Sequence, residues 1–170
     1  MKIETERLFL KNWEKSDVEG YLTLSKDVGY HCFSLPGRFL VRNAEEAQEK
    51  IQNRINLFEK SGLGKFPMYL KATGEFVGTC GIEPYELAGR PEVNLGYRLC
   101  LKHWGRGYAT ESAAAILRYG FRELNLPRII AFVLPQNAAS IKVLEKLGGI
   151  HLQDIEHAGL PHRLYDIARS

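Results

Sequence analysis

The stretch Trp104-Gly105-Arg106-Gly107-Tyr108-Ala109-Thr110-Glu111 joins an apolar run that ends at Leu101 to a segment with the periodicity of an amphipathic helix. Glycine permits a tight turn and the close approach of a ligand, because it has no Cβ. The first N–H groups of the following helix lack intrahelical partners, and the helix dipole adds partial positive charge there. The sequence therefore predicts a strand-to-helix corner that binds an anion such as a pyrophosphate, with Arg106 as counter-charge. The alternative reading is a tight turn without a ligand.

A second corner of the same kind follows, at Leu134-Pro135-Gln136-Asn137-Ala138-Ala139-Ser140, after an apolar run over 128–134. Pro135 ends the strand, and Asn137 is a preferred N-cap residue. Gly148 suits the end of the short helix that begins there. We therefore expect two strand-to-helix corners to face one ligand.

Hydrophobic periodicity predicts strands and helices along most of the chain. We expect helices over Ser16–Lys26, from an Asn43 cap to about Lys60, over 109–124 and after Asn137, with a loop over Val28–Val41. The expected strands are Leu8–Lys11, Phe66–Leu70, Glu75–Glu83, Val93–Leu99, Ile129–Val133, Ile150–Asp154 and Leu164–Ala168.

Composition favours one enzyme-sized domain over residues 1–170, because 45% hydrophobic and 25% charged content fits a single core. The net charge of +3, from 23 basic and 20 acidic residues, gives no sign of a nucleic-acid partner. The chain shows neither a signal peptide nor an apolar run near the ~20 residues of a membrane span, so we expect a cytoplasmic protein. Three widely spaced cysteines and scattered histidines predict neither a disulfide framework nor a metal site.

Three separated signatures carry a resemblance to a known family. They are Glu4-Thr5-Glu6-Arg7-Leu8-Phe9-Leu10, then Asn94–Leu99 followed by Trp104–Glu111, and finally Asn137–Ser140 with Leu147-Gly148. In this order they resemble the opening strand, the central strand with its CoA loop, and the second CoA-contacting helix of the GNAT superfamily of acetyl-CoA-dependent N-acyltransferases. Within it, the chain is similar to the ribosomal-protein-alanine N-acetyltransferase group.

This resemblance implies a mixed α/β fold of three layers. A central twisted sheet, mixed but mostly antiparallel, would be flanked by about four helices, with a V-shaped splay between the two central strands. Pantetheine would lie in the opening, pairing with backbone groups near Leu99. The residues implied in acetyl-CoA binding are Leu99, Trp104, Gly105, Arg106, Gly107, Tyr108, Ala109, Thr110, Asn137 and Ser140.

The resemblance also implies direct attack by a neutral amine on the thioester, which requires a base. Glu92 is the first choice, because Glu92 and Asn94 lie two apart on a strand and face the same side, where they would hold a water. The alternative is that Glu92 only flanks a hairpin, and Glu83 is then the reserve base. Leu144 stands where many members carry a tyrosine, so Ser140 becomes the candidate donor to the departing sulfur. Its alternative role is local hydrogen bonding in the first helical turn.

The acceptor is expected to be an amine, either a protein N-terminus or a small molecule such as a polyamine or aminoglycoside. Contacts to it are assigned to the loop after the first helix, although these side chains also suit simple packing. A non-catalytic acyl-CoA-binding module is a further alternative, and the chain is expected to be a monomer or a homodimer. The loop residues are Tyr30, His31, Phe33, Leu35 and Arg38, with Trp13 and Tyr85 as neighbours.

Overall fold

The structure is a computed structural model that describes residues 1–33 and 40–169. Two predicted acceptor contacts, Leu35 and Arg38, lie outside the described residues. Within those residues, every helix falls short of the length and apolarity that crossing a bilayer requires.

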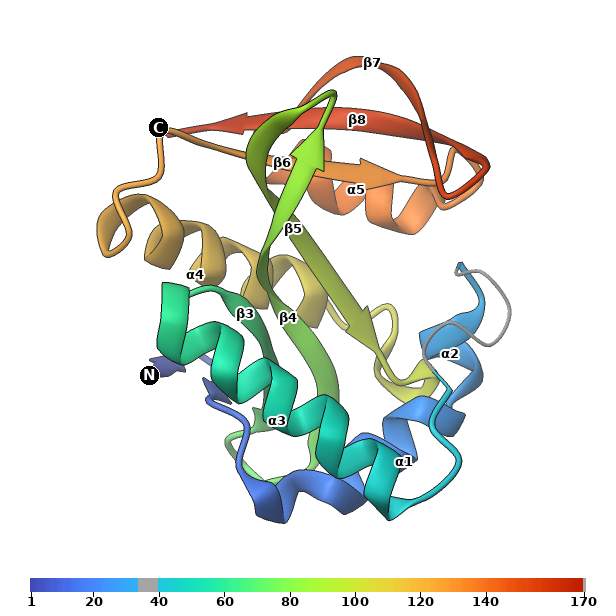
Figure 1. The fold of residues 1–170 in the computed structure, drawn as a ribbon. Helices are drawn as coiled ribbons and strands as arrows, with labels where there is room; N and C mark the ends of the chain where they lie inside the picture. Colours follow the sequence, from blue (N-terminus) through green and yellow to red (C-terminus); the bar gives the residue numbers. More distant parts are fainter. Residues whose placement is uncertain (34–39, 170) are drawn as a thin grey trace.

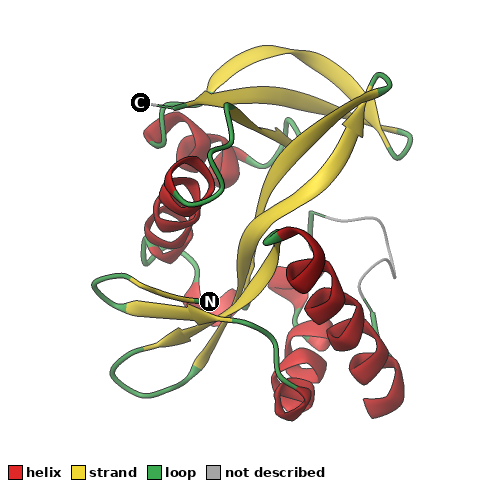
Figure 2. Ribbon diagram, turned by 60° about the vertical axis from the view of Figure 1, so that its left-hand side comes forward, coloured by secondary structure: helices red, strands yellow, loops and turns green. Residues whose placement is uncertain are grey.

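Within the described residues, eight strands form one sheet in the order β1-β2-β3-β4-β5-β6-β8-β7. Figure 2 shows the strands in yellow and the helices in red. All neighbours are antiparallel except β5 and β6, which are parallel. The predicted mixed, mostly antiparallel sheet is therefore confirmed. The strands are β1 (Lys2–Glu4), β2 (Leu8–Lys11), β3 (Gly64–Leu70), β4 (Phe76–Leu87), β5 (Arg90–Leu99), β6 (Arg128–Val133), β7 (Ile150–His157) and β8 (Leu160–Ala168).

Four longer helices and one single-turn helix in the described part of the chain flank this sheet. Figure 1 shows where they lie. They are α1 (Val18–Lys26), α2 (Val28–His31), α3 (Ala44–Ser61), α4 (Tyr108–Arg122) and α5 (Ala138–Lys146), with short 3₁₀ turns η1 (Lys15–Asp17) and η2 (Leu101–His103). In Figure 1 the long β4–β5 hairpin runs from the part of the molecule that holds α1 and α3 up to β6, β8 and β7.

Local sequence explains where the longer helices begin and end. Asn43 caps α3 as predicted, because its side chain accepts a hydrogen bond from the Glu46 N–H at 2.9 Å. The same helix ends at Gly62, whose φ of +70° lies in the left-handed region that favours glycine. Asn137 caps α5 in the same way, through the Ser140 N–H at 3.1 Å.

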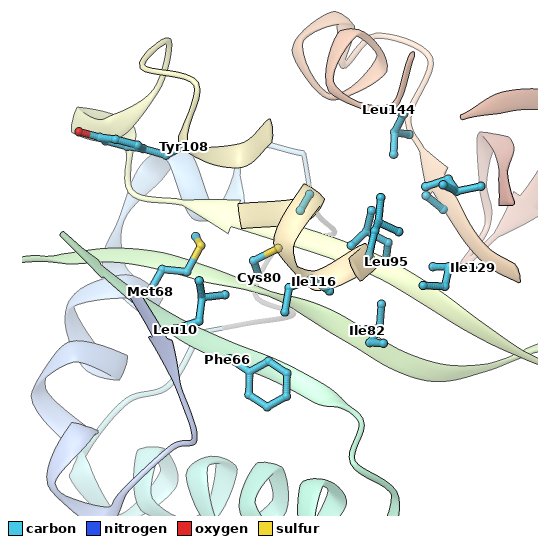
Figure 3. Close-up of a cluster of buried hydrophobic side chains, with 14 of the residues drawn as sticks. Leu10, Phe66, Met68, Cys80, Ile82, Leu95, Tyr108, Ile116, Ile129 and Leu144 are labelled. Carbon is cyan, nitrogen blue, oxygen red and sulfur yellow. The ribbon is translucent and has the colours of Figure 1, made fainter. Parts of the chain in front are cut away.

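The main core lies between α4 and the central strands (Figure 3). Ala113, Ile116 and Phe121, all on the apolar stripe predicted for this helix, are buried. Gly120 permits the close approach, since a Cβ there would lie 2.8 Å from the Ile129 side chain. Figure 3 shows Ile116 beside Cys80 and Ile82.

The first strand, predicted over Leu8–Lys11, is confirmed as β2. The Glu4–Leu10 signature also holds the end of β1 and a turn between the two strands, which Thr5 closes by bonding the Leu8 backbone. One local expectation differs from the structure. The predicted loop over Val28–Val41 begins with the short helix α2, because the Asp27 side chain accepts a hydrogen bond from the Gly29 N–H. The sequence of α2 has a polar cap but no apolar residues that recur at helical spacing, so hydrophobic periodicity did not predict this helix.

Candidate active site

The two central strands separate and open a cavity between them. Among the described residues, Asn94 and Ile130 form the only register pair between β5 and β6. Beyond this pair the strands diverge and enclose a cavity of about 650 Å³, lined from both strands, from the corner before α4 and from α5. The V-shaped splay predicted from the resemblance is therefore confirmed.

The glycine-rich corner before α4 faces this cavity. Gly105 and Gly107 have φ values of +73° and +80°, which side chains rarely adopt. A Cβ on Gly105 would meet no atom within 4 Å, so the surrounding space is open. Because Gly107 is the N-cap, no side chain caps the first N–H groups of α4. These donors, together with the dipole of a 15-residue helix, fit a phosphate group.

Every residue predicted to contact the cofactor lines the cavity except Arg106. The backbone carbonyl of Arg106 instead accepts a hydrogen bond from the Arg7 guanidinium at 2.9 Å. The cavity-lining members of the predicted set are Leu99, Trp104, Gly105, Gly107, Tyr108, Ala109, Thr110, Asn137 and Ser140.

The corner is tied to the start of the chain through Glu111 in the first turn of α4. Glu111 accepts hydrogen bonds from the Thr5 hydroxyl at 2.5 Å and the Arg7 backbone N–H at 2.8 Å, and pairs with the Arg7 guanidinium at 2.7 Å. Partial burial opposes ionisation, but these bonds hold the pKa of Glu111 below its usual value. The Arg7 guanidinium also lies 4.7 Å from the centre of the Tyr108 ring. The Glu4–Leu10 and Trp104–Glu111 signatures, which are far apart in the sequence, are thus in direct contact.

One of the backbone groups near Leu99, the Leu99 carbonyl, already has a hydrogen-bond partner. The Trp104 indole N–H donates to the Leu99 carbonyl at 3.0 Å, and the Trp104 ring stacks on Phe33 at 6.2 Å. Beyond Asn94, β5 has only β4 as a strand neighbour, so its backbone groups directed away from β4 face the cavity. These groups, rather than the Leu99 carbonyl, are the ones available to a ligand.

The α5 side of the cavity carries Ser140 and a tyrosine that sequence reasoning missed. The Tyr97 hydroxyl, on β5, donates to the Ser140 backbone carbonyl at 3.1 Å across the opening. Burial raises the pKa of Tyr97 well above its usual value, so the hydroxyl keeps its proton. Leu144, which stands where many family members carry a tyrosine, is 2% exposed and belongs to the core. The hydrogen bond of Tyr97 joins β5 to α5, two segments far apart in the sequence, so no local pattern predicts it.

The structure does not bring Glu92 into the cavity. Its carboxylate pairs with Arg128 at 3.2 Å, and Arg128 also reaches Asp166 at 3.4 Å. These contacts join β5, β6 and β8 at the closed end of the splay. A carboxylate held by arginine outside the lining is poorly placed to take a proton from an amine in the cavity.

Glu83, the reserve base, lines the cavity and lies opposite Asn94 in the β4–β5 register. Its carboxylate pairs with the Lys65 ammonium at 2.9 Å. Asn94 Oδ1 is buried and has no hydrogen-bond partner in the part of the chain that the structure describes. Glu83 and Asn94 thus lie on one face of the sheet, the arrangement that was predicted for Glu92 and Asn94.

Lys65 reaches this position along a row of small residues. Lys65 on β3 pairs with Gly81 on β4, which pairs with Gly96 on β5. A Cβ on Gly96 would lie 2.7 Å from Lys65 Cε and 3.0 Å from Nζ, so the lysine side chain crosses the sheet where that Cβ would be. Burial lowers the pKa of Lys65, while the neighbouring Glu83 acts in the opposite sense.

Four rings from four strands gather on the wall of the same cavity. We call Tyr85, Phe132, His157 and His162 the ring wall. Phe132 lies 4.4 Å from His157 and 4.8 Å from Tyr85, centre to centre, while His157 and His162 are 5.3 Å apart. Tyr85 Oη and His157 Nδ1 are 2.9 Å apart in a hydrogen bond. Of these four residues, the sequence suggested only Tyr85 as a neighbour of the acceptor.

The predicted acceptor loop is less well represented in the cavity. Phe33 lines it, whereas His31 lies outside the lining and contacts the Ser25 carbonyl through Nε2. Tyr30 belongs to α2. Within residues 1–33 and 40–169, no group of three or more histidine, cysteine, aspartate or glutamate side chains could hold a metal ion.

Comparison with known proteins identifies the class to which this fold and cavity belong. Residues 7–150 match the acetyltransferase (GNAT) domain family, and the chain therefore belongs to that family. It is an N-acetyltransferase, and the family uses acetyl-CoA as acetyl donor.

Individual relatives agree with this assignment. The uncharacterized N-acetyltransferase p20 of Bacillus licheniformis is 35% identical over 84% of this chain and 79% of its own. The protein YkkB of Bacillus subtilis is 41% identical over 96 residues, and the alignment covers 56% of each chain. RimL, a ribosomal L7/L12 α-N-protein acetyltransferase solved with coenzyme A, superposes with a TM-score of 0.85 over 99% of this chain and 98% of its own, at 19% identity. At that identity the likeness to RimL concerns the fold.

Proposed function

We propose that this acetyltransferase, working as one domain over residues 1–170, transfers the acetyl group to a single primary amine, namely a peptide or protein N-terminal α-amine. The observation that carries this proposal is the charge of the cavity. Among its described lining residues, Glu83 is the only carboxylate, and it is paired with Lys65. The other charged lining residues are the cations Arg98, Lys142 and Lys146.

A cationic lining suits the phosphates of coenzyme A and repels acceptors that carry several positive charges. Polyamines and aminoglycosides would place extra ammonium groups beside these cations without carboxylates to receive them. An N-terminal α-amine brings one charge only, and its solution pKa near ~8 makes its proton easier to remove than that of an alkylamine. RimL, of the same fold, acts on a protein α-amine.

Glu83 is the proposed base. Its carboxylate accepts the proton of the acceptor ammonium, directly or through water, so that the amine attacks in its neutral form. Lys65 holds the carboxylate in place and favours its ionised state at a separation of 2.9 Å. Asn94 Oδ1, opposite Glu83, offers the acceptor nitrogen a second hydrogen-bond acceptor.

The opposite side of the cavity is proposed to manage the leaving group. Bound acetyl-CoA supplies a thioester whose acetyl group moves to the amine and whose thiolate departs. Gly105, Gly107 and the first turn of α4 would hold the phosphates. The Ser140 hydroxyl is the proposed hydrogen-bond donor to the sulfur. Tyr97 keeps its proton and steadies the start of α5 through the Ser140 carbonyl.

The test is an acceptor panel measured by release of the coenzyme A thiol, after acetyl-CoA binding has been established by calorimetry. Lysine-free tripeptides with free N-termini are the acceptors, and the same peptides with blocked N-termini are the matched controls. Spermidine and kanamycin represent polycationic acceptors. We expect turnover of the free peptides alone. Faster turnover of spermidine or kanamycin than of every peptide would refute the proposal.

A further inference from the structure

The ring wall shares one face of the sheet with the proposed base. Side chains alternate between the two faces of a strand, so Tyr85 points to the same side as Glu83 on β4. Phe132 likewise points to the same side as Ile130, whose register partner Asn94 lies opposite Glu83. The base and the rings therefore line one side of the cavity.

The spacing between them is short. Same-face residues on a strand are about 7 Å apart along the strand, which sets the offset between the Glu83 carboxylate and the Tyr85 ring. That offset suits an acceptor whose amine and flat side group are joined by about two carbons. Such a molecule can direct its nitrogen at Glu83 while its side group lies against the rings.

The rings are held in place yet open to the cavity. The hydrogen bond between Tyr85 and His157 fixes two of them, and Phe132 packs between these two at 4.8 and 4.4 Å. All four side chains have intermediate exposure and line the cavity. Packing among themselves thus leaves part of each ring available for contact.

We propose that the ring wall binds an aromatic or similarly flat side group next to the acceptor amine, such as the side chain of an N-terminal aromatic residue. This inference rests on the proposed function and adds the class of side group that the acceptor carries. Aromatic pairs in offset or edge-to-face contact gain affinity beyond that of area burial, roughly two- to tenfold for each pair. An aliphatic side group of similar size gains only the burial.

The first experiment needs no variant. It compares kcat/KM for tripeptides that begin with phenylalanine or leucine, and for phenethylamine and hexylamine, with the wild-type enzyme. We expect the aromatic member of each pair to be favoured about tenfold. Ratios near one, with measurable turnover of both members, would overturn this inference alone. If no acceptor turns over although acetyl-CoA binds, the proposed function fails and takes this inference with it.

Variants then locate the preference. Phe132→Leu removes a ring from the wall while keeping an apolar side chain, and we expect the aromatic-to-aliphatic ratio to fall below threefold. Phe9→Leu makes the same change on β2, where the ring stacks on Tyr69 at 5.1 Å, outside the cavity lining. It should leave the ratio unchanged. If Phe132→Leu fails to fold, His157→Leu serves as the second ring deletion. A ratio that stays near tenfold in a folded ring-wall variant would contradict the assignment.

Discussion

Replacing Gly96 by alanine tests whether Lys65 controls the proposed base. The new methyl group would lie 2.7 Å from Lys65 Cε and 3.0 Å from Nζ, well inside ordinary contact distance. The lysine side chain is flexible, so it can move aside without unfolding the sheet. Restoring an ordinary contact at 3.4 Å requires a shift of about 0.7 Å. If this shift is directed away from Glu83, the ion pair lengthens from 2.9 Å to about 3.6 Å.

The expected magnitude follows from the longer ion pair. At an effective dielectric constant of about 20, the Coulomb attraction falls from ~5.7 to ~4.6 kcal/mol. A loss of about 1.1 kcal/mol corresponds to about 0.8 pH unit in the ionisation of the base. A carboxylate accepts a proton only when ionised, and a weaker neighbouring cation makes it ionise at higher pH. The acid limb of the activity profile should therefore move up by about 0.8 pH unit, with the largest loss of rate below neutrality.

The assay is kcat/KM against pH for one peptide acceptor, compared among wild type, Gly96→Ala and the matched control Gly64→Ala. A Cβ on Gly64 would make only ordinary contacts, at 3.5 Å, so its profile should not move. The double variant Lys65→Ala, Gly96→Ala removes the group through which the methyl acts. If Gly96→Ala lowers activity equally at all pH values, or equally in the Lys65→Ala background, the methyl blocks the cavity and our reasoning is refuted.

Three further predictions concern other parts of the molecule. Glu83→Gln should lower kcat/KM by roughly 10²- to 10⁴-fold and leave the affinity for acetyl-CoA unchanged. Glu92→Gln should change kcat/KM less than threefold. A larger loss of kcat/KM in Glu92→Gln than in Glu83→Gln would identify Glu92 as the base. Glu111→Ala should weaken acetyl-CoA binding severalfold in calorimetry, since it frees the corner from the chain start; equal affinity would exclude that role. Of the three cysteines, only Cys32 is exposed, and burial raises the pKa of Cys80 to about 12. One thiol should therefore react with Ellman's reagent in the folded protein, and all three should react after unfolding.

Sequence reasoning succeeded where a single segment carries its own signal. The caps at Asn43 and Asn137 and the glycines before α4 act on neighbouring backbone, so their positions could be predicted within a residue or two. The apolar stripe of α4 is similarly local, because its members recur at helical spacing. The splayed sheet was implied by the resemblance to the GNAT superfamily and did not follow from these local signals.

The polar part of the cavity depends on pairings between strands, which spacing along the chain does not encode. Glu92 and Glu83 are both carboxylates on strands. Only the placement of β6 beside β5 brings Arg128 to Glu92, and only the β4–β5 register places Glu83 opposite Asn94. The position of Lys65 has no local signal, because Gly81 and Gly96, which make room for its side chain, come from two other strands. The ring wall was hidden for the same reason, as its members come from four strands.

The lone parallel pair between β5 and β6 also bears on how the molecule moves. It divides the sheet into two blocks, β1 to β5 and β6 with β8 and β7, joined in the sheet by few backbone hydrogen bonds. A ligand in the opening touches both blocks and restricts their relative tilt. Amide hydrogen exchange on both sides of the opening should then slow, and the unfolding temperature should rise with ligand concentration. Binding of the acetyl donor would thus hold the two blocks of the sheet in a fixed orientation, in addition to supplying the acetyl group.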